Sequence, residues 1–221
     1  MTPKRPTLPP IGGNAGRFGG GRLAVFGYGS LVSRASVAET LEREAPAPIP
    51  ARLAGWRRRW SIYRHNLATE KVFERDDGKP FEHVVGLNLE RAPEATASEW
   101  PNGALIELTR AELERLDLRE LRYDRVEATE CVRGAGDSAA DGSHAFDHVF
   151  VYTAKACHFA AETPPNSIII ASYVRACRSA FNDLEPGAWD LFAATTGEFP
   201  APVVDARLVR DAIPEGNPRA W

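Results

Sequence analysis

The order of strand-like and helix-like segments constrains the fold of this chain most strongly. Apolar segments with strand-like composition occupy the first two-thirds of the sequence, and a helical repeat begins only near Pro165. One face of this expected helix carries residues spaced four apart: Ile169, Tyr173, Cys177 and Phe181. Strands followed by helices are typical of an α+β domain, whereas a doubly wound sheet requires strict alternation of the two. The sequence therefore predicts an α+β fold.

Local patterns predict where the individual elements lie. Strands are expected at residues 22–28, 53–63, 82–90, 104–108, 122–133 and 147–155, and the last two are expected to pair as a long hairpin. Helices are expected at 33–43, at 109–121, from Pro165 and again from Pro186 through Phe192. Connections and loops are expected at 45–51, 65–80, 134–143 and from residue 199 onward. The helix at 109–121 has the clearest signal, because Thr109 and Glu112 form a capping-box pattern.

The length and composition of the chain predict one globular domain. Of its 221 residues 43% are hydrophobic and 26% charged, and the net charge is -3. This charge does not favour a nucleic-acid partner, and no apolar run approaches the ~20 residues that span a bilayer. Residues 1–21 are rich in Pro and Gly and are expected to be a flexible leader, and residues 22–221 a single domain. Three widely spaced cysteines indicate reduced thiols in a cytoplasmic protein.

A glycine-containing turn follows the first expected strand in the sequence LAVFGYGSLVS. Such a turn can bind an anion through its backbone N–H groups. The first alternative is a dinucleotide-binding loop, but its third glycine position is occupied by Val32, and no Gly-Lys-Ser/Thr of a nucleotide-phosphate loop follows. The second alternative is a tight turn with no ligand, in which Gly27 and Gly29 only relax the backbone.

Four segments in order resemble the gamma-glutamylcyclotransferase superfamily. They are FGYGSL after the first strand, GWRRRW, VVGL and, far downstream, LDLRELRY. The resemblance covers residues 22–200, and the pair Arg119-Glu120 is most similar to the ChaC-like branch, which acts on glutathione. This chain departs from the family pattern where Leu121 and Arg122 replace the usual glycines after the glutamate, and where SIYRHN lacks the His-Arg-Gly of the glutathione-specific branch.

The resemblance implies a small distorted mixed β-barrel with flanking helices and a cofactor-free, metal-free enzyme. The implied reaction is an intramolecular cyclisation, in which the α-amine of a γ-glutamyl group attacks its own γ-carbonyl and releases 5-oxoproline and an amine. A single carboxyl can take the proton from the amine and give one to the leaving nitrogen, and Glu120 is the candidate. The residues expected to bind the small-molecule substrate are Tyr28, Gly29, Ser30, Leu31, Tyr123 and Arg57.

Each of these residues also has an ordinary structural interpretation. Glu120 could be an exposed glutamate at a helix end, paired with a nearby arginine. On a strand, Arg57 and Arg59 share one face and Arg58 lies on the other, so a solvated basic face is an alternative to carboxylate binding by Arg57. Tyr123 could bind substrate or pack under the helix.

Other chemistry-bearing residues have a packing or solvation interpretation. His144 and His148, with Asp141 and Asp147, are expected to be solvated side chains rather than metal ligands, and Cys177 is expected to pack in the core. A non-catalytic domain of the same fold that binds a γ-glutamyl or amino-acid-like ligand is the alternative to the enzyme. The sequence leaves open whether the amine half is Cys-Gly, an amino acid or a lysine-type amine, and it leaves the oligomeric state open.

Overall fold

The structure is a computed structural model that describes residues 21–134, 145–212 and 217. The expected leader, apart from Gly21, lies outside the described residues, as do Asp141 and His144. Among the described helices, none is both long and apolar enough to cross a bilayer.

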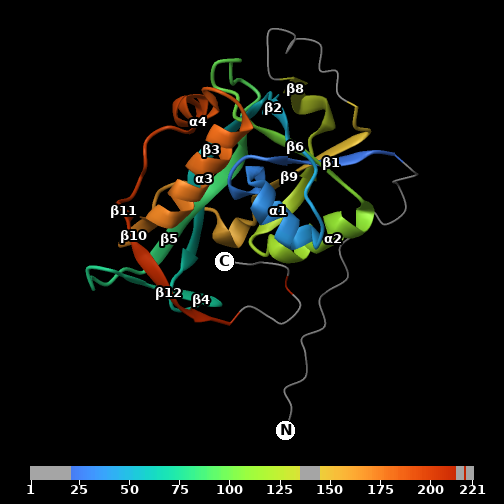
Figure 1. The fold of residues 1–221 in the computed structure, drawn as a ribbon. Helices are drawn as coiled ribbons and strands as arrows, with labels where there is room; N and C mark the ends of the chain where they lie inside the picture. The colour runs from blue at the N-terminus through green and yellow to red at the C-terminus, as the bar shows by residue number, and fades with distance from the viewer. Residues whose placement is uncertain (1–20, 135–144, 213–216, 218–221) are drawn as a thin grey trace.

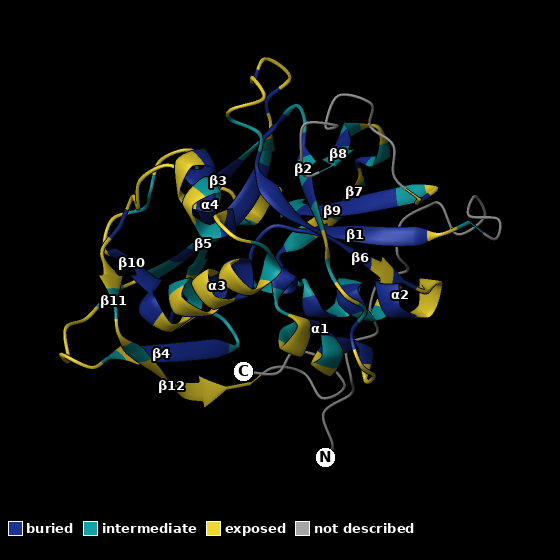
Figure 2. Cartoon of the chain, turned by 45° about the horizontal axis from the view of Figure 1, so that its top comes forward, coloured by how far each residue is buried: buried dark blue, intermediate teal, exposed yellow. Residues whose placement is uncertain are grey.

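The described strands form three sheets; Figure 1 labels every strand except β7, which Figure 2 labels. The six-stranded sheet has the order β7-β9-β1-β6-β2-β8, the four-stranded sheet has the order β11-β10-β5-β3, and β12 pairs with β4. The bounds in the first sheet are β1 Leu23–Gly27, β2 Ile49–Leu53, β6 Asn102–Leu108, β7 Tyr123–Glu127, β8 Val132–Gly134 and β9 His148–Ala154. The other strands are β3 Trp56–His65, β4 Lys71–Arg75, β5 His83–Arg91, β10 Ser167–Ile170, β11 Val203–Val204 and β12 Ala206–Asp211.

Within the described part of the chain, four α-helices flank these sheets. They are α1 Arg34–Leu41, α2 Arg110–Arg119, α3 Ala171–Leu184 and α4 Ala188–Thr196. Because β1 pairs antiparallel with β6 and parallel with β9, the large sheet is mixed, and the expectation of an α+β fold with mixed strands and flanking helices is confirmed. The hydrogen-bonded order of this sheet runs from β7 at one edge to β8 at the other.

The core explains why β1 is the central strand of the large sheet. All five residues of β1 are buried, and the strand is dark blue along its length in Figure 2. Ala24 and Phe26 enter the larger core cluster, whereas Val25 on the opposite face enters the cluster under α1 and α2. Because both faces of this strand are covered, its residues are apolar throughout and do not alternate with polar ones.

Most of the predicted elements are confirmed. The strands expected at 22–28, 53–63 and 82–90 correspond to β1, β3 and β5. The Ser33 hydroxyl accepts the Ser36 N–H at 3.3 Å and caps α1, as expected. The last helix begins at Ala188, two residues after the expected Pro186.

Three expected loops are wrong because they contain strands with distant partners. The connector at 45–51 ends in β2, which pairs with β6 and β8. The polar loop at 65–80 contains β4, and the tail expected to be irregular contains its antiparallel partner β12. Figures 1 and 2 show β4 and β12 side by side at the edge of the molecule. Within β4, the side chains of Lys71, Val72 and Phe73 are buried. This burial stabilises a strand in a segment whose sequence is largely polar.

Two expected elements are divided differently in the structure. Residues 122–133 were expected as one strand, but β7 ends at Glu127 and a 3-10 turn separates it from β8. The Thr129 hydroxyl accepts the Val149 N–H at 2.9 Å, which holds this turn against β9 and sends β8 towards β2. The residues Ser167–Ile170 form β10 rather than the start of α3, because all four are buried beside β5.

Helix α2 carries the candidate catalytic carboxyl at its end, and its start is held by the predicted capping box. The Thr109 hydroxyl accepts the Glu112 N–H at 3.3 Å, and the Glu112 carboxylate accepts the Thr109 N–H at 2.7 Å. Arg43 also donates to both oxygens of Glu112, with 3.0 Å from Nη2 to Oε2. The hydrogen bond from Arg43, followed by those from Thr109, lowers the pKa of Glu112.

The lowered pKa of Glu112 predicts a pH-dependent contribution to stability. Because the folded-state pKa lies below the unfolded value, this stabilisation is present above the unfolded value and is lost as the pH falls through the folded value. We expect Glu112→Gln to destabilise the protein by about 1 kcal/mol at pH 7, and the difference from wild type to shrink on acidification below the ordinary Glu range. Urea unfolding at several pH values measures it. Glu114→Gln, an exposed change on the same helix, is the control, and a pH-independent difference at Glu112 would contradict the assignment.

Candidate active site

One cavity lies where the loop after β1, the end of α2 and the strands β3, β4 and β5 meet. Its volume is about 440 Å³, which is in the range of small-molecule sites. Six of the seven residues predicted from the sequence line it: Tyr28, Gly29, Ser30, Leu31, Glu120 and Tyr123. The chain therefore brings the glycine-containing loop and the distant glutamate to the same cavity.

The loop after β1 has backbone N–H groups that its own turn does not use. Ser30–Val32 form a 3-10 turn, in which Val32 N–H donates to the Gly29 carbonyl at 3.0 Å and Ser33 N–H donates to the Ser30 carbonyl at 3.1 Å. The first N–H groups of any helical turn have no partner within that turn. The N–H groups of Ser30 and Leu31 are therefore suited to bind an anion or a carbonyl oxygen in the cavity.

Arg58 holds this loop from the interior of the protein. Its side chain is fully buried, and Nη1 donates to the carbonyl of Tyr28 at 3.2 Å and to that of Asn102 at 2.6 Å. Further bonds run from Arg58 to the Asn102 side chain, the Phe192 carbonyl and the hydroxyls of Thr195 and Thr196. Burial lowers the pKa of the Arg58 guanidinium to about 9, so the group is charged at neutral pH. Sequence reasoning placed Arg58 opposite Arg57 but did not predict this role.

Gly29 is required because its neighbours leave no room for a side chain. A Cβ at this position would lie 2.9 Å from the hydroxyl oxygen of Tyr173 and 3.2 Å from Cδ1 of Leu87. We therefore expect Gly29→Ala to destabilise the protein by about 1–3 kcal/mol through overpacking. Removing the hydroxyl with Tyr173→Phe should recover part of that loss in the double variant. Chemical unfolding of the two single variants and the double variant measures the coupling, and strictly additive losses would contradict this explanation.

Glu120 ends α2 in a turn that fixes its backbone. Its N–H donates to the Leu116 carbonyl at 2.9 Å, and its own carbonyl accepts the Tyr123 N–H at 2.9 Å. Its side chain is 13% exposed, and Oε1 lies 3.1 Å from Nε of Arg119. Arg119 is anchored in turn by Ser36 and Thr40, whose oxygens accept from its Nη atoms at 2.7 Å. The carboxylate is thus held in place by a buried arginine that is itself fixed to α1.

Three tyrosines, Tyr28, Tyr123 and Tyr152, line the same cavity as this carboxylate. The Tyr28 hydroxyl donates to the Tyr152 carbonyl at 2.7 Å, and the Tyr123 hydroxyl donates to the Leu87 carbonyl at 2.8 Å. Burial, with smaller contributions from Tyr123 and Glu120, raises the pKa of Tyr28. Burial and the nearby Asp117 and Glu120 raise the pKa of Tyr152, whose hydroxyl donates to Asp117 at 2.8 Å. The phenols of Tyr28 and Tyr152 therefore remain protonated donors at neutral pH.

Arg57 lies outside the cavity lining. Its guanidinium donates to Glu94 at 3.0 Å and to Glu99 at 2.7 Å, which is the solvated basic face that the sequence offered as the alternative. Sequence reasoning also missed charged residues that do line the cavity: Arg64, Glu70, Lys71, Arg119 and Arg122. Their signal is weak because they come from a segment that resembles a polar loop and from a helix end.

The histidine and cysteine considered in the sequence analysis, His148 and Cys177, do not line the cavity. His148 lies 2.8 Å from a Glu127 oxygen through Nδ1, and the described residues contain no cluster of three or more His, Cys, Asp or Glu side chains that could hold a metal. Cys177 is fully buried, and burial raises the pKa of its thiol to about 12, so it is a core residue as expected.

Comparisons with known proteins identify the fold. No family model and no curated protein matches the sequence. Among solved structures, a gamma-glutamyl cyclotransferase superposes on 82% of this chain and 93% of its own, with a TM-score of 0.51 and 12% identity. A crystal structure of an uncharacterized protein from Homo sapiens covers the same fractions, with a TM-score of 0.51 and 13% identity. The chain therefore has the fold of the gamma-glutamyl cyclotransferases.

Proposed function

We propose that this protein is a gamma-glutamyl cyclotransferase that converts a γ-glutamyl amide into 5-oxoproline and a free amine. One observation carries the proposal: a single cavity is lined both by the loop Tyr28, Gly29, Ser30 and Leu31 and by the carboxyl of Glu120. A pocket that only binds its ligand has no need of a carboxyl held by Arg119 beside that loop. The fold of the known cyclotransferases agrees with this function.

In the proposed mechanism, Glu120 acts first as a base and then as an acid. The α-amine nitrogen attacks the γ-carbonyl carbon while the Glu120 carboxylate takes a proton from that nitrogen. A nitrogen–carbon bond forms and closes the five-membered ring. The bond between the γ-carbonyl carbon and the nitrogen of the amine half then breaks while Glu120 returns the proton to that leaving nitrogen. Atoms and charges balance without water, an oxidant or a reductant.

The loop and the tyrosines are proposed to supply orientation. The N–H groups of Ser30 and Leu31 bind the α-carboxylate or the γ-carbonyl oxygen, which folds the glutamyl chain so that its amine reaches its own carbonyl. Tyr123 is fixed by its hydrogen bond to Leu87 and forms a wall beside Glu120. Arg119 is a positioning residue, because it holds the carboxylate and does not need to touch substrate.

A substrate panel tests this function. Glutathione, γ-glutamyl amino acids and γ-glutamyl amines are incubated with the full chain, and 5-oxoproline is quantified by mass spectrometry. We expect release from at least one class. If a panel member raises the melting temperature but none yields 5-oxoproline, the protein is instead a binding domain of the same fold.

A further inference from the structure

The cavity lining is cationic, although the whole chain is slightly acidic. The chain has a net charge of -3, but four of the six charged side chains that line the cavity are basic. The basic residues are Arg64, Lys71, Arg119 and Arg122, and the acidic ones are Glu70 and Glu120. Arg119 forms an ion pair with the proposed catalytic Glu120, and these two charges cancel. The net positive charge of the lining therefore comes from the other four residues.

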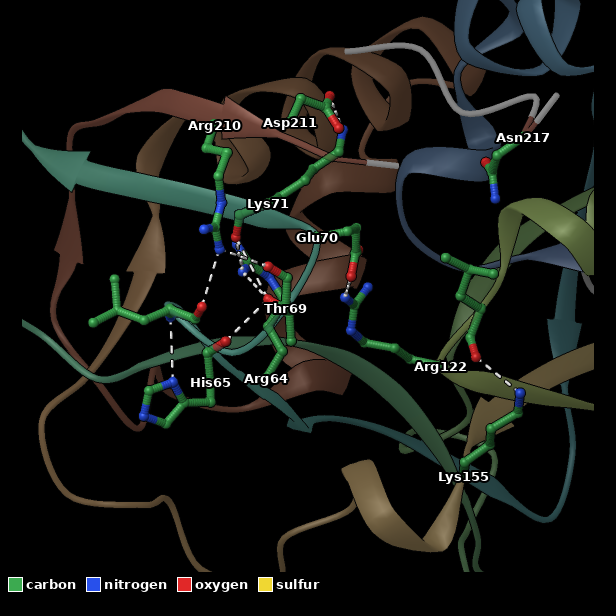
Figure 3. Close-up of polar contacts among 12 residues, drawn as sticks. Arg64, His65, Thr69, Glu70, Lys71, Arg122, Lys155, Arg210, Asp211 and Asn217 are labelled. Atoms are coloured by element: carbon green, nitrogen blue, oxygen red, sulfur yellow. Dashed lines mark hydrogen bonds and ion pairs between the residues drawn. The ribbon is translucent and has the colours of Figure 1, made fainter. Parts of the chain in front are cut away.

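These four residues come from one part of the structure. Arg64 is in β3, Glu70 directly precedes β4, Lys71 is the first residue of β4, and Arg122 follows α2. Figure 3 shows them grouped, with Glu70 and Arg122 pointing towards each other. Nη2 of Arg122 lies 2.5 Å from each Glu70 oxygen, and Nζ of Lys71 lies 3.3 Å from Asp211. The exposed fraction of the side chain is 9% for Arg122 and 2% for Lys71.

Burying two cations at a cavity wall is costly, which points to a role beyond stability. Desolvation offsets much of the attraction in a buried ion pair, so such pairs are poor evidence for a stabilising purpose. Nε of Arg122 is also buried and has no hydrogen-bond partner among the described residues. Orphan donors of this kind call for an explanation such as a missing ligand.

The position of Arg122 relates it to the leaving half of the substrate. Glu120 and Arg122 belong to one turn, which is closed by the hydrogen bond from Tyr123 N–H to the Glu120 carbonyl. Glu120 must reach the leaving nitrogen in the proposed mechanism, so the amine half that carries this nitrogen lies near the same turn. The ion pair with Glu70 shows that the guanidinium of Arg122 can bind a carboxylate at this position in the cavity wall.

We propose that Arg122, supported by Lys71 and Arg64, binds a carboxylate on the amine half of the substrate; this inference rests on the proposed cyclotransferase function. Glu70 holds Arg122 in position until that carboxylate shares the guanidinium. Of the amine halves that the sequence left open, this selects an amino acid or a peptide such as Cys-Gly over a lysine-type or other simple amine. A cationic wall attracts the former and repels a positively charged amine.

Two matched substrates test the inference. γ-Glutamyl-alanine and γ-glutamyl-ethylamine differ only by the carboxylate of the amine half. We expect wild type to prefer the alanine compound by about 10- to 100-fold in kcat/KM, which is the effect of one charge-assisted hydrogen-bonded pair. Arg122→Gln should bring the ratio close to one while turnover of γ-glutamyl-ethylamine persists, and Arg122→Lys should retain part of the preference.

The control is Arg175→Gln, which removes an exposed ion pair with Asp205 and should leave the ratio unchanged. If Arg122→Gln fails to fold because Glu70 has lost its ion pair with Arg122, the neutral double variant Arg122→Gln with Glu70→Gln replaces it. If wild type has nearly equal kcat/KM values for the two substrates, or if Arg122→Gln keeps the preference for γ-glutamyl-alanine, the proposed carboxylate-binding role of Arg122 is wrong. The proposed cyclotransferase function would not be affected by either result. Absence of 5-oxoproline from both compounds would contradict the proposed function itself.

Discussion

Glu120→Gln is expected to reduce 5-oxoproline formation by about 10²–10⁴-fold while the protein stays folded. An amide at this position cannot take a proton from the attacking amine or return one to the leaving nitrogen. Glutamine has nearly the same shape as glutamate and loses only the ion pair with Arg119, and the backbone bonds of Glu120 to Leu116 and Tyr123 do not involve the side chain. We therefore expect a loss in kcat with a melting temperature close to that of wild type.

The matched control for this variant is Glu114→Gln. Glu114 lies on the same helix, its side chain is 56% exposed, and it forms an ion pair with Arg110 at 3.5 Å. Its change should leave kcat/KM near the wild-type value. If Glu120→Gln retains wild-type turnover with γ-glutamyl substrates, the acid–base assignment is wrong.

The largest effect on stability is expected for Arg58→Met. Arg58 donates to buried oxygens from three segments of the chain, which are the loop after β1, β6 and α4, and these oxygens include the carbonyls of Tyr28 and Asn102. Its guanidinium also lies over the ring of Phe192, 3.8 Å from the ring centre. Methionine fills part of the space but leaves these oxygens without donors, so we expect a loss of about 3–5 kcal/mol. Urea unfolding followed by circular dichroism measures it.

The neighbouring residue provides the control. Arg59→Met removes a guanidinium that is 56% exposed and lies 3.9 Å from a Glu90 oxygen, so its effect should stay within about 0.5 kcal/mol. Because Arg58 supports the Tyr28 carbonyl, we also expect Arg58→Met to weaken substrate binding at temperatures where the variant is folded. Equal stability losses for the two variants would contradict the role given to Arg58.

The sequence predicted those parts of the fold whose signals are local. The capping box of Thr109 and Glu112 and the Ser33 cap are formed by residues three positions apart, so the pattern alone was sufficient. The strands β4 and β12 could not be predicted in this way, because each is polar and finds its partner only in the folded chain. Residues 122–133 alternate throughout, and the turn at Thr129 depends on a hydrogen bond to Val149 in another strand.

In the candidate site, too, some residues have a signal in the local sequence and others depend on contacts between distant segments. The loop at 28–31 and Glu120 were found through their resemblance to a family pattern, and the structure places both at one cavity. Arg58 differs from its neighbours Arg57 and Arg59 only by strand periodicity, so the sequence could assign it to another face but could not identify the oxygens that it meets. The ion pair of Arg122 with Glu70 joins the turn after α2 to the residue before β4, and the two residues are too far apart in the sequence for a local pattern to predict it.

The most direct measurement of the central claim is product analysis with γ-glutamyl-alanine in water enriched in oxygen-18. Attack by the α-amine yields 5-oxoproline without the label, whereas attack by water yields glutamate with the label in its γ-carboxylate. A reaction without protein corrects for spontaneous cyclisation, and glutaryl-alanine, which lacks the α-amine, tests whether that amine is required. We predict unlabelled 5-oxoproline with γ-glutamyl-alanine and no turnover of glutaryl-alanine. Labelled glutamate, or cleavage of glutaryl-alanine, would contradict the proposal that this cavity catalyses cyclisation.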